Sequence, residues 1–298
     1  MKLDVLGKDL PVYTTILHRQ RSNHDGWPSH LHYVDAFAGL GRYPSDADVR
    51  AYVEGSPLRA LACDPPFETF WFIERNTGRL QKLEDLVRRE YPDRDVRFLR
   101  GDANEMIQSR VIPGIGVREH AFFFLDPYGL HIDFETIDRL ADVPCDVLIN
   151  LSTMGITRLM DRRSAPTGWR RDTLQRVLGS EALTALESRY TRRPTIFGEV
   201  DEVRGPITAN EVAQAYVDAV SRRFAHASDS LIMRNPRGVP IYGLILVSQN
   251  RTAVRVGNDI IKRFREQQRS RPQASHARSD HPGAPGHGRA YQQRRLIA

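Results

Sequence analysis

The 298-residue chain has few cysteines and no long apolar run, and these absences exclude several classes of protein. Cys63 and Cys145 are its only cysteines; they form no metal-binding motif and give no reason to infer a disulfide framework. No apolar run reaches the roughly 18 residues of a membrane-spanning helix, so we expect none. Residues 1–9 lack the apolar core of a signal peptide. Together these absences favour a reducing, cytoplasmic setting.

Most of the chain also lacks an excess of charge. The formal net charge is +6, but residues 269–298 contain six Arg and one Asp and account for +5 of it. The first 268 residues are therefore not a globally basic nucleic-acid binder. Residues 270–288 are rich in Pro, Gly, Ser, His and Arg, so we expect residues 269–298 to be a disordered basic tail. Such a tail either contacts nucleic acid weakly or is a solvated terminus.

The sequence does have a series of short apolar runs that each lead to an acidic residue. They are Leu31–Phe37, Thr69–Ile73, Val96–Leu99 and Ala121–Leu125, with Asp35, Glu74, Asp102 and Asp126 at or just beyond the end of each run. Helical periodicity separates them, as over Thr77–Tyr91, so the alternation predicts a parallel sheet. Ligands bind outside the carboxyl ends of parallel strands. The four acidic ends therefore indicate one crevice for one polar ligand.

The later part of the chain predicts how the sheet is completed. A fifth strand is expected at Asp146–Ser152, and residues 154–205 are expected to form a helical insertion. Its arginines between 158 and 176 either grip phosphates or form a solvated helical face. Ser230–Arg234 and Ile241–Val247, joined by a Pro/Gly turn, predict an antiparallel hairpin. Such a hairpin distinguishes a class I methyltransferase from an ordinary dinucleotide-binding fold.

The predicted fold is therefore α/β: a Rossmann-like class I methyltransferase fold over residues 1–268. Its sheet is expected to be mostly parallel and seven-stranded, with the antiparallel hairpin near the C-terminus.

The turn after the first strand favours a ligand without phosphates. It contains Asp35, Phe37, Gly39 and Gly41; the glycines allow positive φ and a close approach of the backbone to a ligand. A pyrophosphate site has a third glycine and a helix that starts at once, whereas Arg42–Pro44 and a long loop follow here. The pattern argues against NAD and suits S-adenosylmethionine. Asp35 either accepts hydrogen bonds from an ammonium group or orders the loop, and a plain structural turn is the alternative.

The next two strand ends are the remaining candidates for binding this cofactor. Glu74 either accepts hydrogen bonds from ribose hydroxyls or pairs with Arg75 as an exposed ion pair. The Asp102 carboxylate either accepts the exocyclic amine of adenine, with the Ala103 amide meeting a ring nitrogen, or caps the following helix.

Asp126-Pro127-Tyr128-Gly129 is the candidate catalytic segment. Amino-group methyltransferases have a similar Asp/Asn-Pro-Pro-aromatic motif, in which the acidic side chain and the first Pro carbonyl accept hydrogen bonds from the target amine. The aromatic ring stacks on a flat substrate such as a flipped base. This chain lacks the second proline, and an ordinary β-turn is the alternative. Its histidines, including His131, lack metal-ligand spacing, so no metal is expected.

These segments, together with Gly55–Leu58 and Asp146–Asn150, resemble the three-Cys-motif partner protein family. The resemblance implies a class I methyltransferase fold and a separate, cysteine-rich partner protein of radical-chemistry type. Two hypotheses follow. The chain is an S-adenosylmethionine-dependent methyltransferase acting on an amino group of a nucleobase in DNA or RNA. Alternatively, it is a non-catalytic scaffold that docks the three-Cys-motif protein in a mobile-element or defence system.

Overall fold

The computed structural model describes residues 2–23, 25–44, 52–161, 164–194 and 200–270. The expected disordered tail lies outside the described residues, apart from residues 269–270 at the end of helix α9 (Arg251–Ser270). None of the helices in these ranges is both long and apolar enough to span a bilayer.

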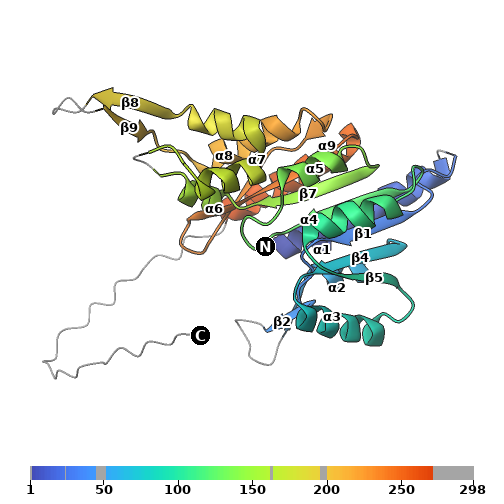
Figure 1. Ribbon diagram of the computed structural model, residues 1–298. Helices are drawn as coiled ribbons and strands as arrows, with labels where there is room; N and C mark the ends of the chain where they lie inside the picture. The colour runs from blue at the N-terminus through green and yellow to red at the C-terminus, as the bar shows by residue number, and fades with distance from the viewer. Residues whose placement is uncertain (1, 24, 45–51, 162–163, 195–199, 271–298) are drawn as a thin grey trace, which may run out of the picture.

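The core is one mixed sheet, drawn in Figure 1. Its order is β10 (His226–Ala227), β12 (Pro240–Ser248), β7 (Cys145–Leu151), β6 (His120–Leu125), β1 (Leu31–Asp35), β4 (Thr69–Glu74) and β5 (Asp95–Arg100), and β11 (Leu231–Arg234) also pairs with β12. The five strands from β7 to β5 are parallel, whereas β12 is antiparallel to both β7 and β11. The predicted fold, a mostly parallel sheet with an antiparallel hairpin, is confirmed.

In the described part of the chain the sheet has eight strands rather than the predicted seven. The extra strand arises because β10 and β11 pair one after the other along the same edge of β12. Ser228 lies between them and still bonds to β12: its backbone NH donates to the Leu246 carbonyl at 2.8 Å, and its Oγ accepts the Leu246 NH at 2.9 Å. The two short strands therefore act as one interrupted edge strand.

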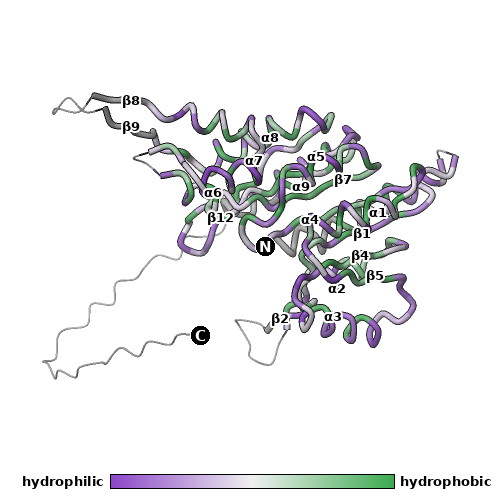
Figure 2. Tube along the Cα trace, in the orientation of Figure 1, coloured by the Kyte–Doolittle hydropathy of each residue, from purple (hydrophilic) through white to green (hydrophobic). Residues whose placement is uncertain are grey.

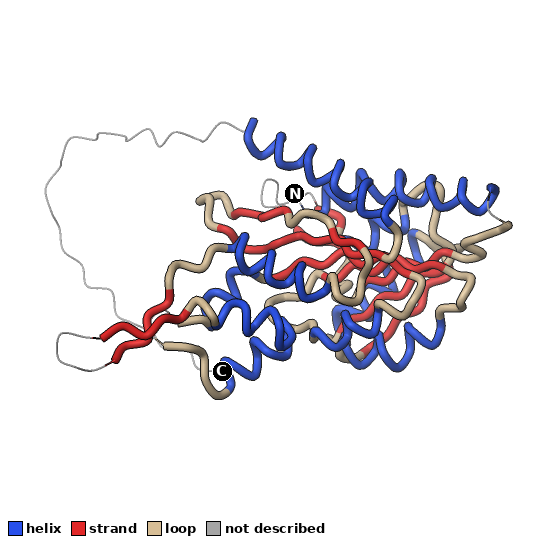
Figure 3. Tube along the Cα trace, turned by 90° about the horizontal axis from the view of Figure 1, so that it is seen from above, coloured by secondary structure: helices blue, strands red, loops and turns tan. Residues whose placement is uncertain are grey.

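Helices cover both faces of the sheet, as Figure 3 shows. On one face, α1 (Lys2–Asn23), α2 (Ser56–Leu61), α3 (Thr77–Glu90) and α9 contribute to a cluster of buried side chains. On the other, α4 (Ala103–Met106), α5 (Phe134–Leu140), α6 (Thr153–Leu159), α7 (Trp169–Glu187) and α8 (Ala209–Val220) contribute to a second cluster. Burial on both faces explains the continuously apolar strands, which are green in Figure 2. The two cysteines are free and buried, one in each cluster.

Local patterns predicted some elements well and others only in part. Helix α3 buries Leu80, Leu83, Leu86 and Val87, the face that its spacing predicts. The predicted helix at residues 103–110 continues from α4 as a π-helical turn (Ile107–Val111) and a 3₁₀ turn (Ile112–Gly114). The prediction that Ser56 caps α2 is wrong: Gly55 is the cap residue. The helix therefore begins at Ser56, one residue earlier than predicted. The Gly55 amide donates to the Gly41 carbonyl at 2.7 Å, which holds the cap residue in place.

Two antiparallel ribbons add to the predicted plan. The expected long loop after β1 contains β2 (Arg42–Pro44) paired with β3 (Tyr52–Glu54). The expected helical insertion contains α6 and α7, but also β8 (Tyr190–Pro194) paired with β9 (Val200–Arg204). In Figure 1 the β8–β9 ribbon projects at the upper left of the molecule, whereas β2 lies at the bottom beside α3.

Candidate functional site

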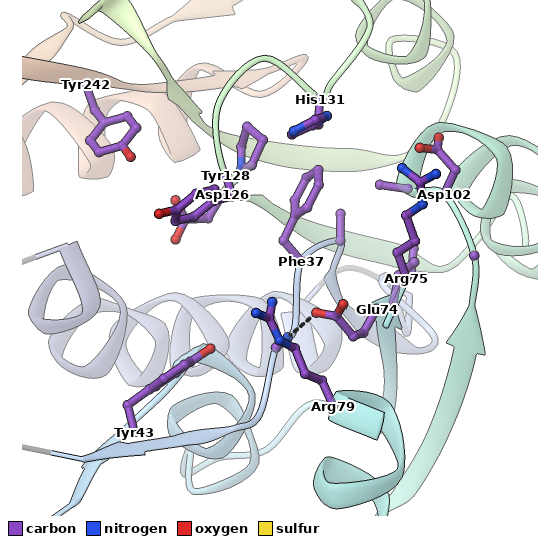
Figure 4. A pocket seen from close by; sticks show the side chains of 16 residues that line it. Phe37, Tyr43, Glu74, Arg75, Arg79, Asp102, Asp126, Tyr128, His131 and Tyr242 are labelled. Carbon is purple, nitrogen blue, oxygen red and sulfur yellow. Dashed lines mark hydrogen bonds between the residues drawn. The ribbon is translucent and has the colours of Figure 1, made fainter. Parts of the chain in front are cut away.

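A cavity of about 340 Å³ opens at the carboxyl ends of β1, β4, β5 and β6. This volume lies in the range of small-molecule sites, roughly 300–1,000 Å³. Eight of the ten predicted site residues line it: Phe37, Gly39, Glu74, Asp102, Ala103, Asp126, Pro127 and Tyr128. Figure 4 shows how their side chains converge. The structure therefore brings together residues that are separated by up to 91 positions in the sequence.

Asp35 and Gly41 do not line the cavity. Asp35 is fully buried at the end of β1, and its Oδ1 accepts the Phe37 amide at 3.1 Å. Burial raises the pKa of Asp35 to about 7, although hydrogen bonds from the Ser56 hydroxyl and the Phe37 amide oppose the shift. The geometry therefore favours the role of ordering the turn over direct contact with a ligand. Gly41 has φ +74°, and a Cβ there would lie 2.6 Å from a methyl of Leu83, so it serves packing against α3.

Gly39 is the glycine that faces the cavity. Its φ is +65°, and a Cβ built on it would lie 2.1 Å from the hydroxyl of Tyr43 on β2. Its amide donates to Glu74 Oε2 at 3.1 Å, the bond drawn as a dashed line in Figure 4. Only glycine combines this backbone conformation with such a close approach. The turn is thereby fixed directly to the end of the neighbouring strand.

Glu74 is held by backbone donors, and the structure shows no ion pair between it and Arg75. Its Oε1 accepts the Asn76 amide at 2.7 Å, while Oε2 accepts the Gly39 amide. A carboxylate has about four lone-pair sites. The preorganised Glu74 side chain therefore retains acceptor capacity toward the cavity that it lines.

Asp102 caps α4, which is one of the two roles that the sequence allows, and it also lines the cavity, where the binding of an adenine amine stays a prediction. Its Oδ1 accepts the Asn104 amide at 2.9 Å. Asn104 then reaches the loop after β6: its Nδ2 donates to the His131 carbonyl at 3.0 Å, and its Oδ1 accepts the Asp133 amide at 2.9 Å. Asn104 therefore fixes the Asp102 side of the cavity to the loop that carries His131, a role that the sequence did not reveal.

The Asp126–Gly129 turn occupies the other half of the cavity. Asn150, fully buried on β7, donates from Nδ2 to Asp126 Oδ1 at 2.6 Å. The Pro127 carbonyl accepts the Gly129 amide at 2.9 Å, which leaves one of its two lone pairs. The Tyr128 side chain is 92% exposed. The turn thus presents a fixed carboxylate, a carbonyl and an exposed aromatic ring next to one another.

Polar and basic side chains that follow β7 have structural partners. Ser152 accepts the Gly155 amide and caps α6, so its hydroxyl serves the helix. The arginines of α7 form intramolecular pairs, which favours a solvated, paired face over a phosphate grip: Arg170 with Asp161, Arg171 with Glu187 and Arg176 with Asp133. No group of three or more metal-ligating side chains occurs among the residues that the structure describes.

Among the further residues that line the cavity, five with polar or aromatic side chains escaped prediction: Tyr43, Arg75, Arg79, His131 and Tyr242. Arg75 and Arg79 are exposed and form no ion pair in the described parts of the chain. Their positions could have identified them from the sequence, because Arg75 follows Glu74 directly and Arg79 lies in the first turn of α3. Tyr242 reaches the cavity from β12, as Figure 4 shows, and only the antiparallel pairing places it there.

Comparison with known proteins shows similarity to methyltransferases only at the level of solved structures. No family model matches this sequence, and no curated protein is significantly similar to it. Trm1 from Pyrococcus horikoshii in complex with S-adenosyl-L-methionine aligns over 85% of this chain and 58% of its own, with 12% identity and a TM-score of 0.41.

Two further solved structures give similar values. A putative S-adenosylmethionine-dependent methyltransferase from Listeria monocytogenes aligns over 74% of this chain and 91% of its own, with 10% identity and a TM-score of 0.37. An S-adenosylmethionine-dependent methyltransferase from Clostridium acetobutylicum aligns over 80% of this chain and 99% of its own, with 11% identity and a TM-score of 0.36. Such distant similarity identifies no substrate, so the function is inferred below from this chain's own residues.

Proposed function

We propose that this chain is an S-adenosylmethionine-dependent methyltransferase that acts on an amino group of a nucleobase in DNA or RNA. One observation carries the proposal. A single cavity joins Phe37, Gly39, Glu74 and Asp102 on one side to Asp126, Pro127 and Tyr128 on the other. The first set suits an adenosine, and the second suits a flat amine acceptor.

The residues on the cofactor side fit the chemistry of S-adenosylmethionine. Glu74 presents lone pairs suited to ribose hydroxyls, and Asp102 presents its second carboxylate oxygen to an exocyclic amine. Gly39 lines the cavity and has no side chain that would separate its backbone from a ligand. The bound cofactor supplies an electrophilic methyl group, and the protein supplies alignment.

On the acceptor side, Asp126 orients the target amine. Its carboxylate accepts an N–H of the amine, and the second lone pair of the Pro127 carbonyl accepts another, so the nitrogen lone pair faces the methyl group. Asn150 holds Asp126 through the 2.6 Å bond. The exposed Tyr128 ring is available to stack on an extruded base. No strong general base is required while these acceptors orient the amine.

Calorimetric titration with S-adenosylmethionine tests the cofactor site. We expect saturable binding that Glu74→Ala abolishes and that Glu84→Ala leaves unchanged, because Glu84 is an α3 carboxylate that pairs with Arg88 and does not line this cavity. Labelled-methyl transfer to pools of DNA and RNA tests the reaction. Asp126→Ala should abolish transfer and retain cofactor binding; full turnover in that variant would remove Asp126 from the mechanism.

A second candidate is the non-catalytic scaffold that docks a three-Cys-motif protein. The sequence departs from the amino-methyltransferase motif at Tyr128, where a second proline is usual, and the Gly129 amide already occupies one lone pair of the Pro127 carbonyl. Co-purification with a cysteine-rich partner, together with cofactor binding without transfer, would favour this function. Methyl transfer by the purified chain alone would count against it.

A further inference from the structure

The turn between β11 and β12 is a basic element at the edge of the cavity. Gly243 pairs with Leu151, the last residue of β7, so residues 235–239 extend beyond the edge where the parallel strands end. Residues 231–248 contain no Asp or Glu. Arg234 and Arg237 are exposed and have no carboxylate partner among the described residues. Their positive charge is therefore not neutralised within the structure.

Hydrogen bonds hold this turn in one conformation. The Asn235 amide donates to the Val239 carbonyl at 2.9 Å, and Asn235 Oδ1 accepts the amides of Arg237 at 3.0 Å and Val239 at 2.9 Å. Arg234 Nη1 donates to the Gly238 carbonyl at 2.8 Å. Each guanidinium has five N–H donors, so both retain donors for a ligand. A rigid turn with two available guanidinium groups suits a phosphate-bearing partner.

In the part of the chain that the structure describes, several other surface arginines pair with carboxylates, unlike Arg234 and Arg237 and unlike Arg75 and Arg79 in the cavity. Arg88 pairs with Glu84, Arg139 pairs with Glu135 at 2.8 Å, and Arg223 pairs with Asp142 at 2.7 Å. These charges are balanced within their own surfaces. The unpaired charge of the β11–β12 turn adds to that of Arg75 and Arg79 in the cavity, and together these arginines raise the local concentration of anions at this edge of the sheet.

The turn borders the acceptor half of the cavity. Tyr242 lines the cavity from β12 and faces the turn that carries Asp126 and Tyr128 at the end of β6 (Figure 4). One strand, β7, separates β12, which carries Tyr242, from β6, which leads to Tyr128. Neighbouring strands lie roughly 4.8 Å apart, so β12 and β6 lie about 10 Å apart along the sheet edge. Glu74 and Asp102 lie farther away, at the ends of β4 and β5. Two aromatic rings thus line the cavity with Asp126, and the basic turn lies just before the strand that carries one of them, Tyr242.

We propose that the β11–β12 turn binds the phosphate backbone of a single-stranded nucleic acid whose target base enters between Tyr128 and Tyr242. Arginines that contact phosphates beside aromatic rings that stack on bases are the typical means of binding single strands. A free nucleotide would not need contacts outside the cavity, and a paired base does not reach into it. The methylation of that base rests on the proposed function; the strand-binding surface is testable without it.

Fluorescence anisotropy with a short labelled single strand and its duplex tests this surface in the full-length protein. We expect the single strand to bind more tightly than the duplex. Arg234→Ala/Arg237→Ala should weaken single-strand binding about tenfold, as two lost surface charge pairs predict. The slope of log K against log salt should become shallower by about 1.4 for two phosphate contacts.

The matched control is Arg88→Ala/Arg139→Ala, which removes the same charge from the paired helical surfaces and should change neither value. Equal weakening in both variants would assign the binding to net charge and overturn the proposal, as would failure of the wild type to bind the single strand. Calorimetry with S-adenosylmethionine on the same proteins separates the two ideas. Cofactor binding without strand binding refutes the strand surface alone, and absent cofactor binding refutes the proposed function.

Discussion

The buried carboxyl of Asp35 makes the stability of this protein depend on pH in a predictable direction. The side chain is fully buried at the end of β1, and burial raises its pKa from 3.8 to about 7. The folded state therefore holds this proton more tightly than the unfolded state does. The contribution of the Asp35 carboxyl to the free energy of unfolding is fully present below about pH 4 and is lost as the pH rises through about 7. Asp35→Asn removes the titration and keeps an acceptor for the Phe37 amide.

The magnitude follows from the size of the shift. About three pKa units correspond to about 4 kcal/mol of free energy of unfolding. Roughly 2.5 kcal/mol of this change falls between about pH 5 and pH 8, where most proteins can be studied. The wild type should therefore lose that much stability relative to Asp35→Asn over this interval.

Urea denaturation of both proteins across this interval measures the effect. Other groups titrate in the same range, but they are common to both proteins and cancel in the difference. Asp93→Asn, at an exposed carboxyl, controls for the change in charge. A difference between wild type and Asp35→Asn that stays constant with pH would refute the reasoning, because it would mean that the carboxyl is not protonated preferentially in the folded state.

Three further predictions concern the cavity itself. Gly39→Ala should cost about 1–2 kcal/mol and weaken calorimetric S-adenosylmethionine binding, whereas Gly26→Ala, with a similar positive φ but open space, should leave binding unchanged. Asn104→Ala should lower the free energy of unfolding by about 2 kcal/mol and weaken cofactor binding, because Asp102 is then no longer linked to the His131 loop. An unchanged thermal denaturation midpoint would contradict this prediction. Asn150→Ala should reduce labelled-methyl transfer by about 10²-fold and keep cofactor binding, because Asp126 loses its positioning donor.

The site combines residues that line the cavity with residues that hold other residues in place. Glu74 and Asp102 each satisfy backbone amides and also line the cavity. Asn104 and Asn150 position the loops on its two sides without belonging to its lining. Loss of either asparagine should therefore disturb one half of the site more than the other. Measuring cofactor binding and methyl transfer separately distinguishes the two effects.

Local sequence patterns were sufficient for much of the fold. The apolar runs that end in Asp35, Glu74 and Asp126 predicted buried parallel strands, because strands covered on both faces need apolar side chains in continuous succession. The same runs predicted the edge where the site lies, since the carboxyl ends of parallel strands meet there. The hairpin was predicted by its turn residues, which include Gly238 with φ +77°. Each of these signals lies within a few consecutive residues.

Tertiary structure alone decided the roles of individual side chains. Asp35 and Glu74 occupy equivalent strand ends, yet one is buried beneath the turn and the other lines the cavity, because packing of α2 against β1 closes over the first. Tyr242 lies about 200 positions from Phe37 and reaches the same cavity only through the antiparallel pairing of β12 with β7. Sequence periodicity records which residues are buried along one element. It does not record which distant element covers them, because that depends on long-range packing.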